Sequence, residues 1–307
     1  KFQNFNKSIH TLNHKLEKKT EKSFLNVSKN SKSDLIIFNP NVSNWEKIPI
    51  EIKLYFKPRF IADNFQVYSN GKKIKSQLED IKCFKDGYIR SATLVCNPSV
   101  SKRSYASLTL KEVHIKHNPE NKLSNSIKTK STEISLSKYG GNLKSIKFST
   151  SSDKSLINTR KYSYRTAGQI FTVNKANQKF NDLIKTKIIS ETNDLAIRKK
   201  ISCDLELPFG DLTKIFYVYE DSPRIDVKYI FTFKDYNPSI FRINLLDLNL
   251  NNFDNTSLSY STNNGGNLET FSLKEPIFHD NPTNSKISSM CCLGSTDCLL
   301  DVGDKNH

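Results

Sequence analysis

The sequence predicts an all-β chain in which an N-terminal helix is followed by a small β-sandwich and then a larger antiparallel β-sandwich, a supersandwich. From residue 34 onward, short β-prone runs alternate with turn signals, and no helical periodicity interrupts them. The chain has 307 residues and is 36% apolar and 10% aromatic, which suits two domains with real cores. We divide it into the end of a helical bundle (1–33), a small β-sandwich (34–115), a linker or loop (116–131) and a large, incomplete β-sandwich (132–307).

The predicted helix lies within the first 25 residues. Its apolar residues recur at three- and four-residue steps, at Phe5, Ile9, Leu12 and Leu16, and Lys and Glu occupy the other face. The pattern is typical of the last amphipathic helix of a preceding bundle. The chain begins with Lys1 rather than Met, and we expect both ends to be cuts through a longer protein.

The first β series begins with the apolar run 35–38, which Asn39-Pro40 ends. Residues 48–56 alternate apolar and polar side chains, as a half-buried strand does. Asn70-Gly71 between two β-prone runs is a hairpin signal. Further strands are expected over 81–84, 88–95 and 105–113.

The second β series follows residues 116–131, which offer little to bury. After its first run, 134–136, a tight turn is expected at Gly140-Gly141, because paired glycines allow positive φ. The run 225–233 is apolar on both faces in places, which favours a large sheet covered by another sheet over an edge exposed to water. The remaining strands are expected over 134–136, 143–148, 185–190, 195–207, 211–219, 240–250 and 257–260.

The net charge of +16 does not by itself indicate a nucleic-acid partner. Of the 47 basic residues, 39 are Lys, and they are scattered along a chain whose composition is typical of an AT-rich genome. Nucleic-acid readers favour Arg for its bidentate fork. We therefore expect no nucleic-acid partner, although non-specific binding through Lys is a third possibility. No apolar run approaches the roughly 20 residues that span a bilayer, so no membrane partner is expected either.

Metal and thiol signals are weak. The six cysteines form no CxxC pair and are expected to be reduced, and the cytoplasm is slightly favoured as the compartment. His10 and His14 stand at i, i+4 but lack the Glu of an HExxH motif, and His114 and His117 have no ligand cluster nearby. We therefore expect no metal or cofactor within this chain.

Several short motifs occur in an order that resembles the β region of α-mannosidases of glycoside hydrolase family 38. The run 35–40 followed by Trp45 is similar to the family's opening after its helical bundle. Asn70-Gly71 with Gln77 is similar to the family's first hairpin. Residues 98–105 are similar to a short family motif that runs from a Pro through a Gly to a Tyr, but Ser101-Lys102 replaces the Gly here. Further resemblances are the turn 140–146, the strand pair 217–227, and the segments 260–266, 279 and 294–305.

The resemblance implies a role without a catalytic centre. Family 38 enzymes hold Zn²⁺ and an Asp nucleophile in an N-terminal α/β domain, which would precede Lys1. No position here matches that domain, so no catalytic residue is assigned and Zn²⁺ is expected only in the catalytic domain. The implied partners are that domain, in cis, and a mannose-containing oligosaccharide or glycan.

Glu220 and Asp221 are the acidic pair that could be considered catalytic, but a structural role in a turn is the better interpretation. Glu220-Asp221 precedes Ser222-Pro223, and acidic residues are ordinary in such turns. Arg224 is expected to pair with Glu220 or Asp226 rather than to clamp a substrate.

The most suggestive polar cluster comprises Asn263, Asn264, Asp301, Asp304 and His307. Loop Asn and Asp side chains suit sugar hydroxyls, although Asn263-Asn264 followed by two glycines is also an ordinary turn. We expect the chain to support the catalytic domain and to frame its carbohydrate site through these loops. The alternative is a stand-alone carbohydrate-binding or interaction module without enzymatic activity.

Overall fold

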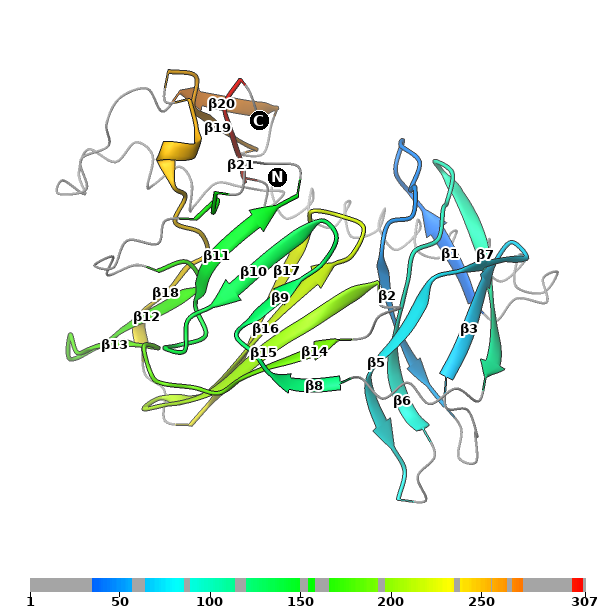
Figure 1. Ribbon diagram of the computed structural model, residues 1–307, viewed down its shortest axis with the longest axis horizontal. Helices are drawn as coiled ribbons and strands as arrows, with labels where there is room; N and C mark the ends of the chain where they lie inside the picture. The colour runs from blue at the N-terminus through cyan, green and yellow to red at the C-terminus, as the bar shows by residue number, and fades with distance from the viewer. Residues whose placement is uncertain are drawn as a thin grey trace, which may run out of the picture. The chain divides into compact units, whose positions relative to one another are not determined.

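The computed structural model describes eleven stretches of the chain, and the predicted N-terminal helix lies outside them. They are residues 35–56, 64–85, 89–113, 120–149, 154–157, 166–192, 197–234, 238–254, 256–263, 267–272 and 300–305. Apart from one short 3-10 helix, η1 (Leu250–Asn252), the regular structure there is β, in several antiparallel sheets (Figure 1). The prediction of an all-β chain is therefore confirmed for this part.

The chain forms two compact units, each of which is assembled from segments that are not contiguous in the sequence. Unit 1 comprises Lys1–Asn121, Glu191–Lys199 and Tyr219–Asp221, and unit 2 comprises Lys122–Ser190, Lys200–Val218 and Ser222–His307. A single cut within 116–131 would therefore not separate them, because short pieces near residues 195 and 220 return to unit 1.

Unit 1 contains two antiparallel sheets that share one core. One has the order β1-β7-β3-β4 and the other the order β2-β6-β5. Their strands are β1 (Leu35–Asn39), β2 (Ile50–Tyr55), β3 (Asn64–Ser69), β4 (Lys72–Ile74), β5 (Ser76–Cys83), β6 (Ile89–Cys96) and β7 (Ser104–Val113). The core takes Val67 and Leu108 from the first sheet and Leu54, Leu94 and Cys96 from the second, which gives unit 1 a sandwich-like arrangement.

The hairpin expected at Asn70-Gly71 is confirmed. Ser69 pairs with Lys72, and Asn70 and Gly71 have φ values of 49° and 81°. Positive φ at both central positions matches the right-handed twist of the flanking strands, and Asn and Gly tolerate that conformation best.

Unit 2 contains four sheets, and three of them contribute residues to a larger core or pack against it. Their orders are β17-β16-β15-β14-β8, β11-β10-β9, β13-β12-β18 and β20-β19-β21. The strands are β8 (Glu120–Leu123), β9 (Ser126–Lys128), β10 (Thr132–Leu136), β11 (Leu143–Phe148), β12 (Gln169–Asn174), β13 (Lys179–Asn181), β14 (Ile188–Thr192), β15 (Arg198–Leu207), β16 (Gly210–Tyr219), β17 (Ile225–Phe233), β18 (Pro238–Asn244), β19 (Ser259–Asn263), β20 (Leu268–Ser272) and β21 (Leu300–Gly303).

The main core of unit 2 lies between the five-stranded sheet and the sheets of β9–β13. Ile134 of β10, Ile170 of β12, Ile201 of β15 and Phe216 of β16 are all almost fully buried in one cluster. Apolar burial of this size is the main source of stability for stacked sheets.

Two expectations from the sequence were wrong. The segment 116–131 is not only a linker or loop, because β8 and β9 lie within it and Ile127 is buried in the core. The run 225–233 is the edge strand β17 of its sheet, and Val227, Ile230 and Phe233 remain substantially exposed. The outcome depends in each case on whether another strand lies alongside, which the local sequence pattern does not specify.

Candidate functional site

The five residues predicted to approach carbohydrate are only partly brought together. Asn263 ends β19, and Asp301, which is exposed, pairs with Ser261 of the same strand in the β20-β19-β21 sheet. Asn264 and His307 lie outside the described residues. Asp304 follows Gly303, which pairs with Ser259 at the other end of β19, roughly 13 Å from Asn263 along the strand.

Asp304 has a structural partner. Its Oδ2 accepts a hydrogen bond of 2.6 Å from the backbone N–H of Asp254. The Asp254 carboxylate in turn accepts hydrogen bonds from the hydroxyls of Thr256 (2.7 Å) and Ser257 (2.8 Å), and the N–H of Lys305 donates to Ser257 Oγ. Asp304 therefore helps to fix the chain that enters β19.

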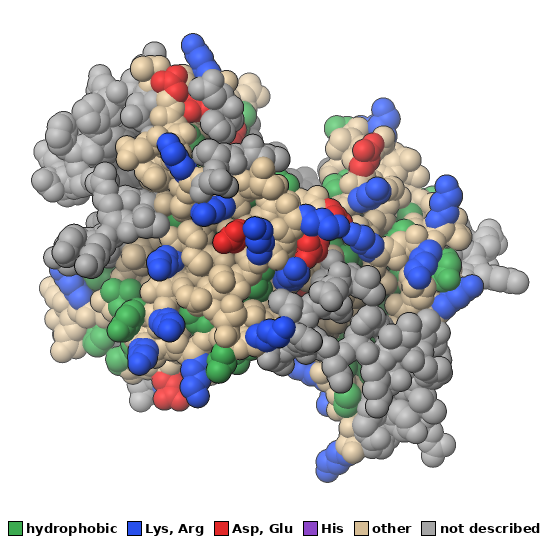
Figure 2. Space-filling model, viewed as in Figure 1, with side chains coloured by type: hydrophobic (Ala, Val, Ile, Leu, Met, Phe, Trp, Pro, Cys, Tyr) green, Lys and Arg blue, Asp and Glu red, His purple; other side chains and the backbone are tan. Residues whose placement is uncertain are grey.

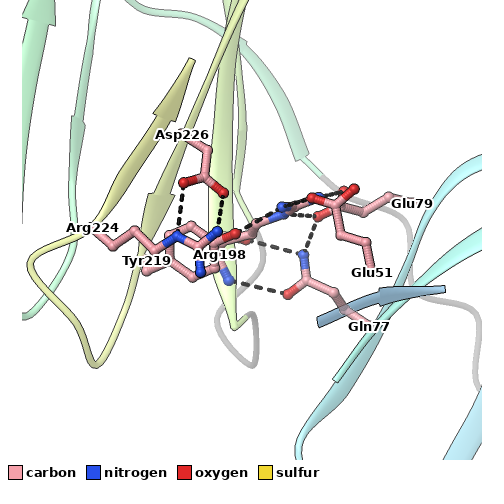
Figure 3. Close-up of polar contacts among 7 residues, drawn as sticks. All are labelled: Glu51, Gln77, Glu79, Arg198, Tyr219, Arg224 and Asp226. Carbon is pink, nitrogen blue, oxygen red and sulfur yellow. Dashed lines mark hydrogen bonds and ion pairs between the residues drawn. The ribbon is translucent and has the colours of Figure 1, made fainter. Parts of the chain in front are cut away.

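A dense polar cluster among the described residues of unit 1 surrounds Arg198 at the start of β15 (Figure 3). Its Nε donates to Glu79 Oε1 at 2.9 Å and its Nη2 to Glu79 Oε2 at 2.6 Å. Its Nη1 donates to Glu51 Oε1 at 2.5 Å and to the Tyr219 hydroxyl at 2.9 Å. The arginine side chain is only 1% exposed, and the ring of Tyr219 lies 5.7 Å from its Cζ. The bidentate geometry and the burial make this a strong, fixed pair.

Gln77 on β5 holds the same segment through its backbone. Its Oε1 accepts hydrogen bonds from the N–H groups of Ile197 (2.5 Å) and Arg198 (3.2 Å), and its Nε2 donates to the carbonyl of Arg198 at 3.1 Å. The same amide nitrogen donates to Glu79 at 2.6 Å (Figure 3). The glutamine picked out by its motif is therefore the anchor of residues 197–198.

The electrostatics of this cluster do not suit acid–base chemistry. Burial by itself would lower the pKa of the Arg198 guanidinium, but the hydrogen bond and negative charge of Glu79 and the hydrogen bond to Glu51 outweigh it and raise the pKa. Both carboxylates are committed to one permanent cation. A glycosidase needs one carboxyl group that can give a proton and another that can attack or activate water, and neither is free to do so here.

Charged side chains in the predicted turn also have partners. Glu220 pairs with Lys199 (2.8 Å), and Asp221 pairs with Lys75 (2.5 Å). Arg224 forms a two-pronged contact with Asp226, with distances of 2.7 and 2.9 Å, so the expected ion pair is confirmed for Asp226 (Figure 3). These residues act as structural pairs rather than as a substrate clamp.

Unit 2 contains a second polar cluster, which is fully buried. Lys214 on β16 and Asp182 have side chains with 0% exposure, and Lys214 Nζ lies 2.6 Å from Asp182 Oδ2. The same nitrogen donates to Asn142 Oδ1 at 2.5 Å and to the carbonyl of Gly168 at 2.8 Å. Lysine is almost never fully buried unless it is paired, and the pairing with Asp182 meets that condition here.

The Gly140-Gly141 turn explains how Asn142 reaches Lys214. Gly140 and Gly141 have φ values of 71° and 59°. A Cβ on Gly141 would lie 2.0 Å from the Sγ of Cys203, so only glycine fits beneath this strand. The turn therefore places Asn142 at the start of β11, directly in the core.

Sequence reasoning missed both polar clusters, although one signal was present. Leu212, Lys214, Phe216 and Val218 have the same parity along β16, so the lysine lies on the core face of the strand. A lysine in an otherwise apolar inward series indicates a buried charge. Arg198 shows no comparable signal, because its neighbours Lys199 and Lys200 make it look like part of a solvated run.

Metal and nucleic-acid sites receive no support from the described stretches. Among those residues no group of three or more His, Cys, Asp or Glu side chains could hold a metal ion, and the four histidines at 10, 14, 114 and 117 lie outside them. The Lys and Arg side chains visible in Figure 2 are scattered over that face rather than gathered into one stripe. No helix in the described part is long and apolar enough to cross a membrane.

Comparison with known proteins adds no relative. No protein-family model matches the chain, and no curated protein matches it.

Proposed function

We propose that this chain is the non-catalytic β region of an α-mannosidase-like glycoside hydrolase. In this proposal an N-terminal helix ends a helical bundle, and a small β-sandwich and a larger supersandwich follow it. The region supports a Zn²⁺-dependent catalytic domain encoded upstream in the same gene. It also frames the site for a mannose-containing oligosaccharide or glycan.

The main support is that residues of the resembling motifs occupy framework positions. Asn39 is fully buried, and its Nδ2 donates to the carbonyls of Ser43 (2.9 Å), Val100 (3.1 Å) and Ser101 (3.2 Å). Trp45 is joined to Val100 by two backbone hydrogen bonds of 2.8 and 2.9 Å. The opening motif at 35–45 and the motif at 98–105 are therefore bonded directly to each other.

Other motifs have comparable roles. The Asn70-Gly71 hairpin sets the register of β3 and β4, and Gln77 anchors residues 197–198. The Gly140-Gly141 turn places Asn142 in the core of unit 2. Motifs that specify a framework are what a supporting region requires, since a rigid support keeps the loops of a neighbouring domain in place.

The chemistry of the described residues agrees with a supporting role. Glu51 and Glu79 are both bound to Arg198, and Glu220 and Asp221 are bound to lysines. These carboxylates stabilise the fold. The reaction in the proposal is therefore assigned to the upstream domain.

The decisive experiment begins with the gene. Reading the coding sequence upstream of Lys1 is expected to reveal a domain with His-x-Asp metal ligands and an Asp nucleophile. The full-length product is then expected to hydrolyse a 4-nitrophenyl α-mannoside, and a chelator is expected to abolish that activity. A reading frame that lacks such a domain would overturn the proposal in favour of the stand-alone binding module.

The carbohydrate contact is proposed for Asn263, Asn264, Asp301, Asp304 and His307, and the exposed Asp301 is the residue chosen for the test. In the full-length enzyme, Asp301→Ala is expected to raise KM for oligosaccharides and to leave kcat and the melting temperature unchanged. Glu46→Ala, an exposed carboxylate in unit 1, is the matched control and is expected to change neither constant. An unchanged KM for every oligosaccharide in the Asp301 variant would remove this contact from the proposal.

A further inference from the structure

The fully buried cluster of Lys214, Asp182 and Asn142 combines the three groups that an amide-forming reaction needs. Lys214 supplies an amine, Asn142 a carboxamide, and Asp182 a carboxyl group that touches both. Lys214 Nζ contacts Asn142 Oδ1 at 2.5 Å and Asp182 Oδ2 at 2.6 Å, and Asn142 Nδ2 donates to Asp182 Oδ1 at 3.5 Å. The carboxyl group therefore bridges the attacking nitrogen and the nitrogen that would leave.

The surroundings favour a nucleophilic amine. Burial lowers the pKa of Lys214, against the opposing influence of the Asp182 charge and hydrogen bond. The Tyr229 ring lies 5.7 Å from Nζ, and its hydroxyl donates to the same carbonyl of Gly168 that accepts from Lys214. A lysine held in a dry, largely apolar core loses the water shell that keeps an ordinary lysine protonated.

Each reacting group is also fixed in position. The N–H of Ile170 donates to Asp182 Oδ2 at 2.9 Å, and the Gly140-Gly141 turn holds Asn142. The three residues come from β16, from the segment between β13 and β14, and from the start of β11, so all of them are held by strands that pack in one core. Such positioning can remove a large part of the activation free energy of an otherwise very slow reaction.

We propose that Lys214 and Asn142 form an intramolecular isopeptide bond, with Asp182 as the catalytic proton carrier. This inference does not depend on the proposed function. It assigns to unit 2 a covalent cross-link between β16 and the start of β11.

The reaction balances without any outside reagent. A proton passes from Lys214 Nζ to Asp182, and the neutral amine attacks Cγ of Asn142, so that the Nζ–Cγ bond forms and the carbonyl electrons move to Oδ1. Asp182 gives its proton to Nδ2 and takes a proton from Nζ. The carbonyl then re-forms, the Cγ–Nδ2 bond breaks with its electron pair on nitrogen, and ammonia leaves. No group is oxidised or reduced.

The cross-link has a defined mass and a defined peptide. The folded full-length product is expected to weigh about 17 Da less than its sequence requires, which is the loss of one ammonia. Trypsin cannot cleave at a modified Lys214, so residues 201–224 are expected to be joined to residues 139–144 in one branched peptide. Tandem mass spectrometry of that peptide locates the bond.

Matched variants separate the bond from an ordinary buried ion pair. Lys214→Met and Asn142→Ala are expected to restore the full sequence mass, and Asp182→Asn is expected to leave most molecules unlinked. Lys234→Ala breaks an exposed ion pair with Asp211 and is expected to keep the mass loss. The proposal does not require the first three variants to fold well, because the mass of the folded wild-type protein already tests it.

Two results would overturn the inference. One is a folded wild-type protein with its full sequence mass and separate peptides 139–144 and 201–214. The other is a mass loss that maps to different residues. An Asp182→Asn protein linked to the wild-type extent would overturn the role given to Asp182.

Discussion

The guanidinium of Arg198 meets the carboxylate of Glu79 through two parallel hydrogen bonds, although the residues are 119 positions apart in the chain. Both side chains are largely buried, with exposures of 1% and 13%. Desolvating two charges is costly, and only close geometry with further hydrogen bonds offsets that cost. Gln77 and Tyr219 supply those further bonds, so the arrangement specifies how residues 197–199 lie in unit 1.

Removing the arginine is expected to be much more harmful than removing its exposed partner. Arg198→Ala leaves the Glu79 carboxylate buried without its cation, and we expect a loss of about 3–5 kcal/mol in the free energy of unfolding. Glu51 is 53% exposed, and Glu51→Gln is expected to cost less than about 1 kcal/mol. Chemical denaturation measures both values.

The matched control for that comparison is Arg224→Ala. Its pair with Asp226 has the same two-pronged geometry but a 45% exposed arginine, and we expect a loss below about 1 kcal/mol. Equal losses for Arg198→Ala and Arg224→Ala would contradict the importance given to burial.

Gly141 is expected to be far less tolerant of a side chain than Gly71, although both have positive φ. At Gly71 a Cβ meets nothing within 4 Å, so Gly71→Ala costs only the backbone strain of about 1 kcal/mol. At Gly141 a Cβ would also collide with Cys203 Sγ, and we expect a total of about 2–4 kcal/mol.

A double-mutant cycle tests the cause of that difference. In a Cys203→Ala background the collision is gone, so the additional cost of Gly141→Ala is expected to fall toward the value at Gly71. An unchanged additional cost would show that the sulfur is not the obstacle.

The described thiols are expected to differ sharply in reactivity. Burial raises the pKa of Cys96 to about 12 and that of Cys203 to about 11, whereas Cys83 is exposed. At pH 8 the thiolate fraction of Cys203 is then only about one in a thousand, and solvent access is lacking as well. In native protein iodoacetamide is expected to label Cys83 and to spare the other two until the chain unfolds, as peptide mass spectrometry would reveal. Rapid native labelling of Cys96 would contradict the packing of unit 1.

Acid is expected to weaken the turn that precedes β19. Hydrogen bonds from the Thr256 hydroxyl, the Thr256 N–H and the Ser257 hydroxyl lower the pKa of Asp254 below its ordinary 3.8. A carboxyl group with a lowered folded-state pKa stabilises the protein above its unfolded pKa, and this stabilisation is lost as the pH falls through the folded value. Asp254→Asn should therefore lower the melting temperature at pH 6 and have progressively less effect below pH 3.8. An effect of the same size at both pH values would exclude this origin.

The sequence by itself determined the β character, the two β series and the turns that carry their own chemistry. Asn70-Gly71 predicts its hairpin because both residues tolerate positive φ, and Arg224 finds Asp226 two positions away. Such features are local, so the information needed to predict them lies within a few residues.

Tertiary structure decided everything that depends on which strands become neighbours. The pairing of Arg198 with Glu79 and the meeting of Lys214 with Asn142 and Asp182 join residues that are far apart in the chain. The edge position of β17 depends likewise on the assembled sheet, in which β17 has β16 as its one neighbour. It also separated Asp304 from Asn263, which composition alone had grouped. The physical reason is that burial and pairing energies belong to the assembled sheets, and a short stretch of sequence does not contain its future neighbours.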